Sequence, residues 1–171
     1  TVTVRVTDGA GNSATASDTI VLDTTAPTIS TAVLEGGAAW TNKTGNTVQL
    51  TVNSADGSGS GVAQVCVSGG ATAGCQAFAG AGTVNIALTA SDGNKSVLVT
   101  VKDAAGNTSL TSNPSIGLDT VAPTLSSITI EAGAAAIGGP VVSIALVAND
   151  NAGGSGLASS AFRTGAAGVY G

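Results

Sequence analysis

Residues 97–119, VLVTVKDAAGNTSLTSNPSIGLD, decide the fold, because nearly the same text occurs at residues 2–23, VTVRVTDGAGNSATASDTIVLD. Asp8 of the earlier copy matches Asp103 of the later one, an offset of 95 residues. A repeat of about 100 residues that consists of short alternating strands is typical of tandem β-sandwich modules, whereas solenoid repeats are much shorter. The sequence therefore predicts an all-β protein made of consecutive modules.

The repeat divides the chain into three segments. Each copy runs into a Thr-Xaa-Ala-Pro-Thr sequence, where the proline favours an extended and fairly stiff linker. We therefore expect 1–24 to be the C-terminal strands of a preceding module, 25–120 to be a complete module and 121–171 to be the N-terminal half of a following one. Together, the two partial segments lack the stretch that aligns with 77–95. Either the chain is a window from a longer array, or neighbouring subunits complete its ends.

Apolar and polar residues alternate along most of the expected strands, as in strands with one buried face. The first segment is expected to hold strands at 2–7 and 19–23, and the third to hold strands at 125–130 and around Val142, Ile144 and Leu146. For the complete module we expect about seven strands, at 28–34, 47–53, 62–68, 75–79, 83–89, 95–102 and 115–119. The residues expected to face inward are Val48, Leu50, Val52, Val65, Val67, Val84, Ile86, Leu88, Val97, Val99 and Val101.

The composition excludes several classes of function. Only 9% of the residues are charged and 2% are aromatic, so the core must consist of small aliphatic side chains. With five basic residues and a net charge of −5, the chain has no basic patch for nucleic acid. The chain has no histidine, so neither a Ser-His-Asp triad nor the usual Cys/His zinc sites can form. We therefore expect no enzyme, and no apolar run has the length of about 20 residues that a membrane helix needs.

The two cysteines, Cys66 and Cys75, flank a Gly-rich turn in GVAQVCVSGGATAGCQAF. They are placed to face each other across a hairpin, which predicts a disulfide and hence an oxidising location outside the cytoplasm. The alternative is two small buried thiols. The only tryptophan, Trp40, is expected to cap one end of the core, with an exposed position as the alternative.

The combined motifs resemble a known family. Asp-Xaa-Ala-Gly-Asn followed by Leu-Asp-Thr-Xaa-Ala-Pro-Thr, with an aspartate and Ser-Gly-Val upstream, is similar to the bacterial immunoglobulin-like repeats of large secreted adhesins and other cell-surface proteins. The resemblance covers essentially the whole chain. It implies immunoglobulin-like β-sandwich modules of about seven strands, and calcium bound at the junctions between modules. By similarity, the candidate ligands are Asp103, Asn107 and Asp119 at one junction and Asp8, Asn12 and Asp23 at the previous one, with Asp56 and Asp150 as weaker candidates.

Two interpretations of these acidic residues stay open. Calcium takes six to eight oxygen ligands, which clustered Asp, Asn and backbone carbonyls on a Gly-rich turn can supply. Asp and Asn beside Gly are also ordinary turn formers that bond to their own backbone. The ten acidic residues in 171 favour the second interpretation, because a heavily calcified array carries more.

Three functions follow as hypotheses. The first is a structural one, an extracellular stalk, fibre or surface layer at the cell surface whose partners are neighbouring repeats. The second is a filament of identical subunits, in which incomplete modules exchange strands. The third is a module that binds carbohydrate or a host receptor, for which the aromatic residues available are Trp40, Phe78, Phe162 and Tyr170. A surface glycan could also be bound through regions outside this chain.

Overall fold

The protein is all-β, as the sequence predicts. A computed structural model describes residues 1–162, so Tyr170 and the end of the 121–171 segment lie outside the described residues. Within that range the chain forms twelve strands in four sheets and two 3-10 segments, with no α-helix. No helix among these residues is long and apolar enough to cross a membrane.

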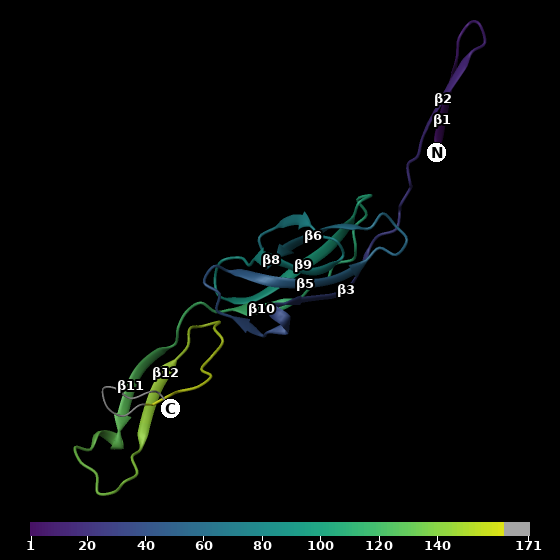
Figure 1. The fold of residues 1–171 in the computed structure, drawn as a ribbon. Coiled ribbons are helices and arrows are strands. Elements are labelled where there is room, and N and C mark those ends of the chain that lie inside the picture. Colours follow the sequence, from purple (N-terminus) through teal and green to yellow (C-terminus); the bar gives the residue numbers. More distant parts are fainter. Residues whose placement is uncertain (163–171) are drawn as a thin grey trace.

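The middle of the chain forms two sheets (Figure 1). The three-stranded sheet has the order β3-β5-β8, with β3 at Thr28–Leu34, β5 at Thr47–Ala55 and β8 at Ala81–Ala87. The five-stranded sheet has the order β4-β10-β9-β6-β7, with β4 at Trp40–Thr41, β10 at Ser115–Leu118, β9 at Gly93–Asp103, β6 at Val62–Gly69 and β7 at Gly74–Ala77. These bounds differ by at most two residues from the seven strands expected, and β4 is an additional strand.

A single core lies between the two sheets. The fully buried side chains alternate along the strands on either side, and they include Val48, Leu50 and Val52 of β5 and Val97, Val99 and Val101 of β9. Val65, Ile86 and Leu88 are buried as expected, whereas Val67 and Val84 are only partly buried at the margin. Two sheets that enclose one core of aliphatic residues have the architecture of a β-sandwich.

Trp40 lies at the edge of the sandwich, in β4. This strand pairs in parallel with β10, so that Trp40 lies opposite Gly117. The indole is 39% exposed, and it occupies the space that a Cβ on Gly117 would need. Trp40 therefore packs on the backbone of the last strand of the sandwich and is neither a buried cap nor fully exposed.

The start of the chain forms a separate hairpin of β1 (Val2–Thr7) and β2 (Ser13–Asp18). The strand expected at 19–23 is wrong. A tight turn, closed by a hydrogen bond from Asp8 N to Asn12 O at 2.8 Å, reverses the chain directly after β1. Pairing therefore begins at Ser13, and the apolar residues Ile20, Val21 and Leu22 follow the strand as exposed extended chain.

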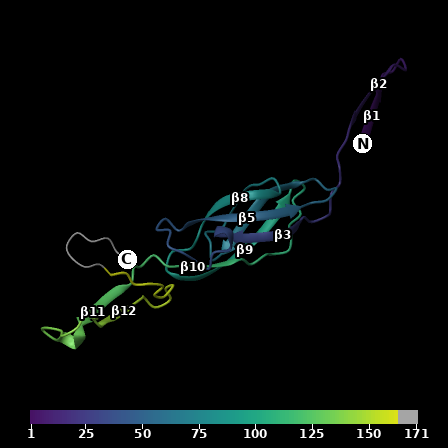
Figure 2. The same cartoon turned by 60° about the horizontal axis from the view of Figure 1, so that its bottom comes forward.

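The end of the described chain forms a second hairpin, of β11 (Thr124–Ile130) and β12 (Ile144–Asn149). Val142, expected in the second strand, lies outside it. The 3-10 segments η1 (Glu35–Gly37) and η2 (Glu131–Gly133) follow β3 and β11 at equivalent places. The two hairpins lie at opposite ends of the sandwich, and the molecule is elongated (Figures 1 and 2).

Candidate metal centre

Three aspartates meet at the end of the sandwich that faces β1–β2. Asp56 directly follows β5, Asp103 is the last residue of β9, and Asp23 lies in the segment that leads into β3. The topology brings these places together, because β3 begins opposite the end of β5, and β6 begins opposite Asp103. We call this place, formed by 23–27, 56–61 and 103–107, the first junction.

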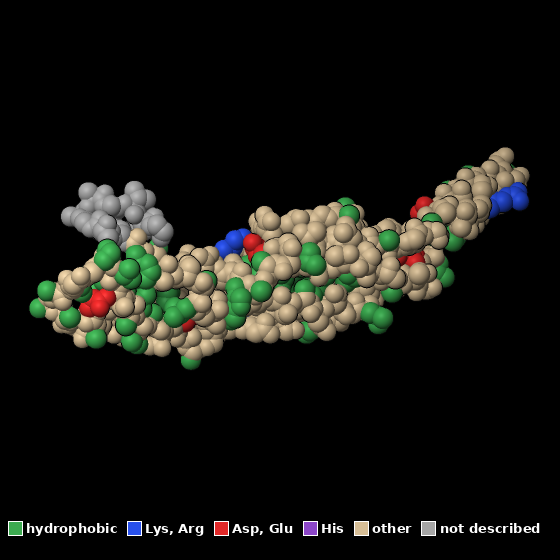
Figure 3. All heavy atoms as spheres, turned by 90° about the horizontal axis from the view of Figure 1, so that it is seen from below, with side chains coloured by type: hydrophobic (Ala, Val, Ile, Leu, Met, Phe, Trp, Pro, Cys, Tyr) green, Lys and Arg blue, Asp and Glu red, His purple; other side chains and the backbone are tan. Residues whose placement is uncertain are grey.

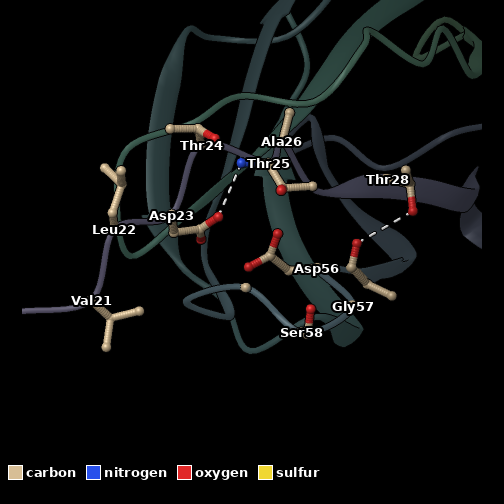
Figure 4. A pocket seen from close by; sticks show the side chains of 12 residues that line it. Val21, Leu22, Asp23, Thr24, Thr25, Ala26, Thr28, Asp56, Gly57 and Ser58 are labelled. Carbon is tan, nitrogen blue, oxygen red and sulfur yellow. Dashed lines mark hydrogen bonds between the residues drawn. The ribbon is translucent and has the colours of Figure 1, made fainter.

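The carboxylates of the first junction are close to one another. One oxygen from each of Asp23, Asp56 and Asp103 lies within 4.8 Å of the other two. Asp56 and Asp103 are only 8% and 4% exposed. Asp23 and Asp56 also line a cavity of about 500 Å³ between the linker and the 55–59 loop, and their carboxyl groups lie across it from each other (Figure 4).

Backbone amides and one side-chain amide hold the carboxylates in place. Asp103 Oδ1 accepts from Asn107 N, and Asp103 Oδ2 from Asn107 Nδ2, both at 2.8 Å. The same Nδ2 lies 3.2 Å from the backbone oxygen of Asp23, to which it donates. Asp23 Oδ2 accepts from Ser60 N at 2.6 Å, and Asp56 Oδ2 accepts from Gly61 N at 2.7 Å. The linker and the two loops thus form one hydrogen-bonded unit.

One oxygen of this unit has no partner. Asp56 Oδ1 is buried and makes no hydrogen bond. A buried carboxylate oxygen without a donor is costly, and cations commonly satisfy such groups. The only ion pair among residues 1–162 joins Lys43 to Glu35, so no basic side chain neutralises the three aspartates. The oxygen-only donor set and the uncompensated charge suit a hard cation such as Ca²⁺.

The loop that carries Asp56 has no space for a side chain at Gly59. A Cβ there would overlap Asp56 Oδ2 and would lie 2.8 Å from Asp23 Oδ2. The chain can therefore wrap closely around the two carboxylates because residue 59 is a glycine.

Hydrogen bonding also sets the charge state of Asp23. The pKa of its carboxyl is lowered from the ordinary 3.8, first by the Ser60 side chain and then by the backbone amides of Ser60 and Thr25. Asp23 is therefore ionised at neutral pH and available as an oxygen ligand.

The second junction, formed by 119–123 and the 150–156 loop, repeats two of the hydrogen bonds of the first junction. Asp119 Oδ2 accepts from Ser155 N at 2.7 Å, as Asp23 does from Ser60. Asp150 Oδ2 accepts from Gly156 N at 2.6 Å, as Asp56 does from Gly61. The pKa of Asp119 is lowered chiefly by the Ser155 backbone amide. Within the described part of the chain, Asp119 and Asp150 belong to no group of three close carboxylates, although Asp92 Oδ1 accepts a hydrogen bond from Thr120 Oγ1 at 2.9 Å nearby.

The structure groups the candidate ligands differently from the sequence analysis. Asp103 and Asn107 lie with Asp23 and Asp56, not with Asp119. β9 and β10 are antiparallel, so Asp103, the last residue of β9, and Asp119, which follows β10, lie at opposite ends of the sandwich. Asp8 and Asn12 stand apart from Asp23, in the turn of β1–β2, where Asn12 Nδ2 donates to Asp8 Oδ2 at 2.8 Å.

Sequence reasoning missed the role of Ser60 and Ser155. Ser60 precedes Gly61-Val62 and Ser155 precedes Gly156-Leu157, so both serines begin a similar three-residue run. Their backbone amides dock the preceding linker aspartate onto the next loop. The recurrence of that run four or five residues after an aspartate is the signal that could have shown it.

Cys66 and Cys75 are joined by a disulfide in the structure. They lie directly opposite each other on β6 and β7, with their Cα atoms 4.0 Å apart. The bond therefore attaches an edge strand to its only neighbour in the sheet.

Comparison of the chain with models of protein families, with curated proteins and with solved structures found no match.

Proposed function

We propose that this chain is a structural segment of an extracellular or cell-surface protein, in which tandem immunoglobulin-like modules form a stalk, fibre or surface layer. The modules are 1–24, 25–120 and 121–171. The sequence repeat supports this division, and so does the pairing of β11–β12, which matches that of β3–β5. The role is mechanical and not enzymatic, and the Cys66–Cys75 bridge suits an oxidising environment.

The observation that carries this proposal is the repeated docking of the linker. At both junctions a linker aspartate accepts a hydrogen bond from the backbone of a serine in the following unit, Asp23 from Ser60 at 2.6 Å and Asp119 from Ser155 at 2.7 Å. A stalk needs successive units to be held in a fixed direction. The same contact at two places, one repeat apart, serves that need, because each unit is attached to the linker that precedes it.

Calcium is the proposed second component of the first junction. Asp23, Asp56 and Asp103 would each supply a carboxylate oxygen, and the buried, unpartnered Asp56 Oδ1 is the atom that most needs a cation. Bound calcium would neutralise part of the negative charge of these three carboxylates, which no basic side chain neutralises. The ion would connect residues of the linker and of two loops, and so stiffen the junction.

Small-angle scattering of the 171-residue chain tests the proposal, with calcium and then with excess chelator. We expect an extended particle with calcium, and a shorter or more flexible one with a lower Tm after chelation. Asp56→Asn should remove the calcium response, whereas Asp18→Asn, in exposed β2, should retain it.

The two parts of the proposal fail differently. If calcium changes neither shape nor Tm, the three aspartates are turn formers and the metal part is wrong. If the particle is flexible with and without calcium, the units are not held in a fixed direction and the stalk function itself is wrong.

A further inference from the structure

A pocket of about 380 Å³ lies beside Trp40, at the opposite end of the sandwich from the first junction. Its walls come mostly from 35–43, between β3 and β5, and its lining includes Glu35, Trp40, Asn42, Lys43, Asp119 and Ser155. This volume falls within the range of about 300–1,000 Å³ that is usual for small-molecule sites. None of the three aspartates of the proposed calcium site lines it, so the pocket is a separate feature.

Trp40 gives the pocket an aromatic surface that is held in place. Its six-membered ring packs on Gly117, where a Cβ would overlap three of the ring carbons. The residue is nevertheless 39% exposed and lines the pocket. The pairing of β4 with β10 fixes its backbone. A side chain that is already ordered loses little conformational entropy when a ligand packs on it.

Hydrogen-bonding groups surround the indole. Lys43 Nζ donates to Glu35 Oε1 at 2.6 Å, and Gln49 N donates to the same oxygen at 2.6 Å. An ammonium has three N–H donors, and Glu35 is the only ion-pair partner of Lys43 among residues 1–162. Asn42 is exposed, and its amide both donates and accepts. The pocket therefore offers donors and acceptors beside an apolar ring.

The equivalent place in the third segment lacks most of these groups. The repeat aligns Glu35 with Glu131, which likewise accepts from a backbone amide. Counted from that glutamate, the third segment has alanine and glycine in place of Trp40, Asn42 and Lys43, namely Ala136, Gly138 and Gly139. The glutamate is thus part of the repeated framework, whereas the aromatic and polar set is particular to the complete module. The repeated fold does not require this set, so its presence needs another reason.

The charge of the surroundings favours a neutral ligand. Charged side chains are few and scattered on the face of the molecule that Figure 3 shows. Within the pocket, the Lys43 ammonium is paired with Glu35, and Asp119 Oδ2 accepts from Ser155 N at 2.7 Å. An anion or a cation would therefore have to compete with an existing partner for its counter-charge.

We propose that this pocket binds a neutral saccharide. One pyranose ring places its apolar C–H face on the Trp40 indole, and its hydroxyl groups bond to Asn42, Lys43 and Glu35. Saccharides suit the pocket because they combine an apolar ring face with hydroxyl groups, each of which donates and accepts. The inference goes beyond the proposed stalk function, because it gives the complete module a ligand that neither calcium binding nor the docking of linkers requires.

Fluorescence of Trp40 tests the inference directly, because the chain has no other tryptophan. The 171-residue chain is titrated with neutral oligosaccharides of glucose, galactose, mannose or N-acetylglucosamine, and saturation-transfer NMR measures the same binding. We expect a saturable change in fluorescence with at least one of them. Asn42→Ala should raise its dissociation constant about two- to tenfold, which corresponds to one lost hydrogen bond. Trp40→Ala should abolish the NMR signal.

Asn85→Ala is the matched control, because Asn85 is an exposed asparagine of β8 outside the pocket. It should bind as the wild type does. Since Trp40→Ala also removes packing on Gly117, the Asn42 variant, which retains that packing, decides the outcome. No saturable response to any of these saccharides, or equal affinity of Asn42→Ala and the wild type, would show that the inference is wrong. A response only to choline or only to glucuronic acid would also overturn it, because the pocket would then take a charged ligand.

Discussion

The indole of Trp40 lies on the backbone of Gly117, in space that any other residue at position 117 would fill with its Cβ. The two residues belong to β4 and β10, whose parallel pairing joins the entry of the sandwich to its last strand through hydrogen bonds from Gly117 N to Ala39 O at 2.8 Å and from Asp119 N to Thr41 O at 3.0 Å.

Gly117→Ala should destabilise the sandwich, because the new methyl group displaces the indole and strains the β4–β10 pair. We expect a loss of about 1–3 kcal/mol in the free energy of unfolding, measured by chemical denaturation. Gly45→Ala is the matched control, since a Cβ at Gly45 meets nothing within 4 Å. Equal stability of the two variants would contradict the close packing of Trp40 on Gly117.

Val99→Ala and Val4→Ala change equivalent positions of the repeat in different surroundings. Val99 is fully buried in the core, so its truncation should cost about 2 kcal/mol. Val4 is exposed in a lone hairpin, so its truncation should leave the melting of the sandwich unchanged at low protein concentration. If the two substitutions had equal cost in dilute solution, the β1–β2 hairpin would be packed within the monomer.

The docking of both linkers should weaken in acid. The pKa values of Asp23 and Asp119 are lowered from 3.8 by hydrogen bonds that exist only in the folded junctions. The stabilisation is therefore fully present above pH 3.8 and is lost as the pH falls through the lower folded-state values. Scattering between pH 7 and pH 2 should show the particle becoming flexible in this acidic range. In Asp23→Asn with Asp119→Asn, the same pH change should have little effect on flexibility.

Asp56→Asn should have opposite effects with and without calcium. In chelator, the substitution removes one of three clustered negative charges and should raise the Tm or leave it unchanged. With calcium, the wild type gains stability by binding and the variant does not, so the wild type should melt at the higher temperature. Calorimetry in both buffers measures this reversal. A variant that is less stable by the same amount in both would indicate a structural role for Asp56 without a cation.

The strands of the sandwich were predictable because their core positions alternate strictly. Val48, Leu50 and Val52 lie two residues apart, so they point to the same side of an extended strand. The pattern therefore predicts both the strand and the face of it that is buried. β4 was not predictable, because two residues carry no periodicity. The expected strand at 19–23 was wrong because its apolar residues suggested burial, whereas the tight turn at 8–12 makes the small polar residues of β2 the pairing partner of β1.

The members of the metal centre were predictable from the repeat, but their grouping was not. In the sequence, Asp103 and Asp119 both lie shortly before the same linker, so they were expected to share one site. In the structure, the antiparallel pairing of β9 and β10 places them at opposite ends of the sandwich, and the sequence does not show this strand direction. The resemblance makes Asp56 only a weaker candidate, and nothing in its local sequence shows that one of its oxygens is buried without a donor.

The disulfide between Cys66 and Cys75 limits how far the sandwich can lengthen when the two ends of the chain are pulled apart. The bond closes a sequence separation of 9 residues. At about 3.3–3.6 Å for each extended residue, the unravelled chain would be about 30 Å shorter with the bond than without it. A stalk with this bond in only one of its units would therefore stretch unevenly, and the reduced and oxidised forms would differ in length only after that unit had unfolded.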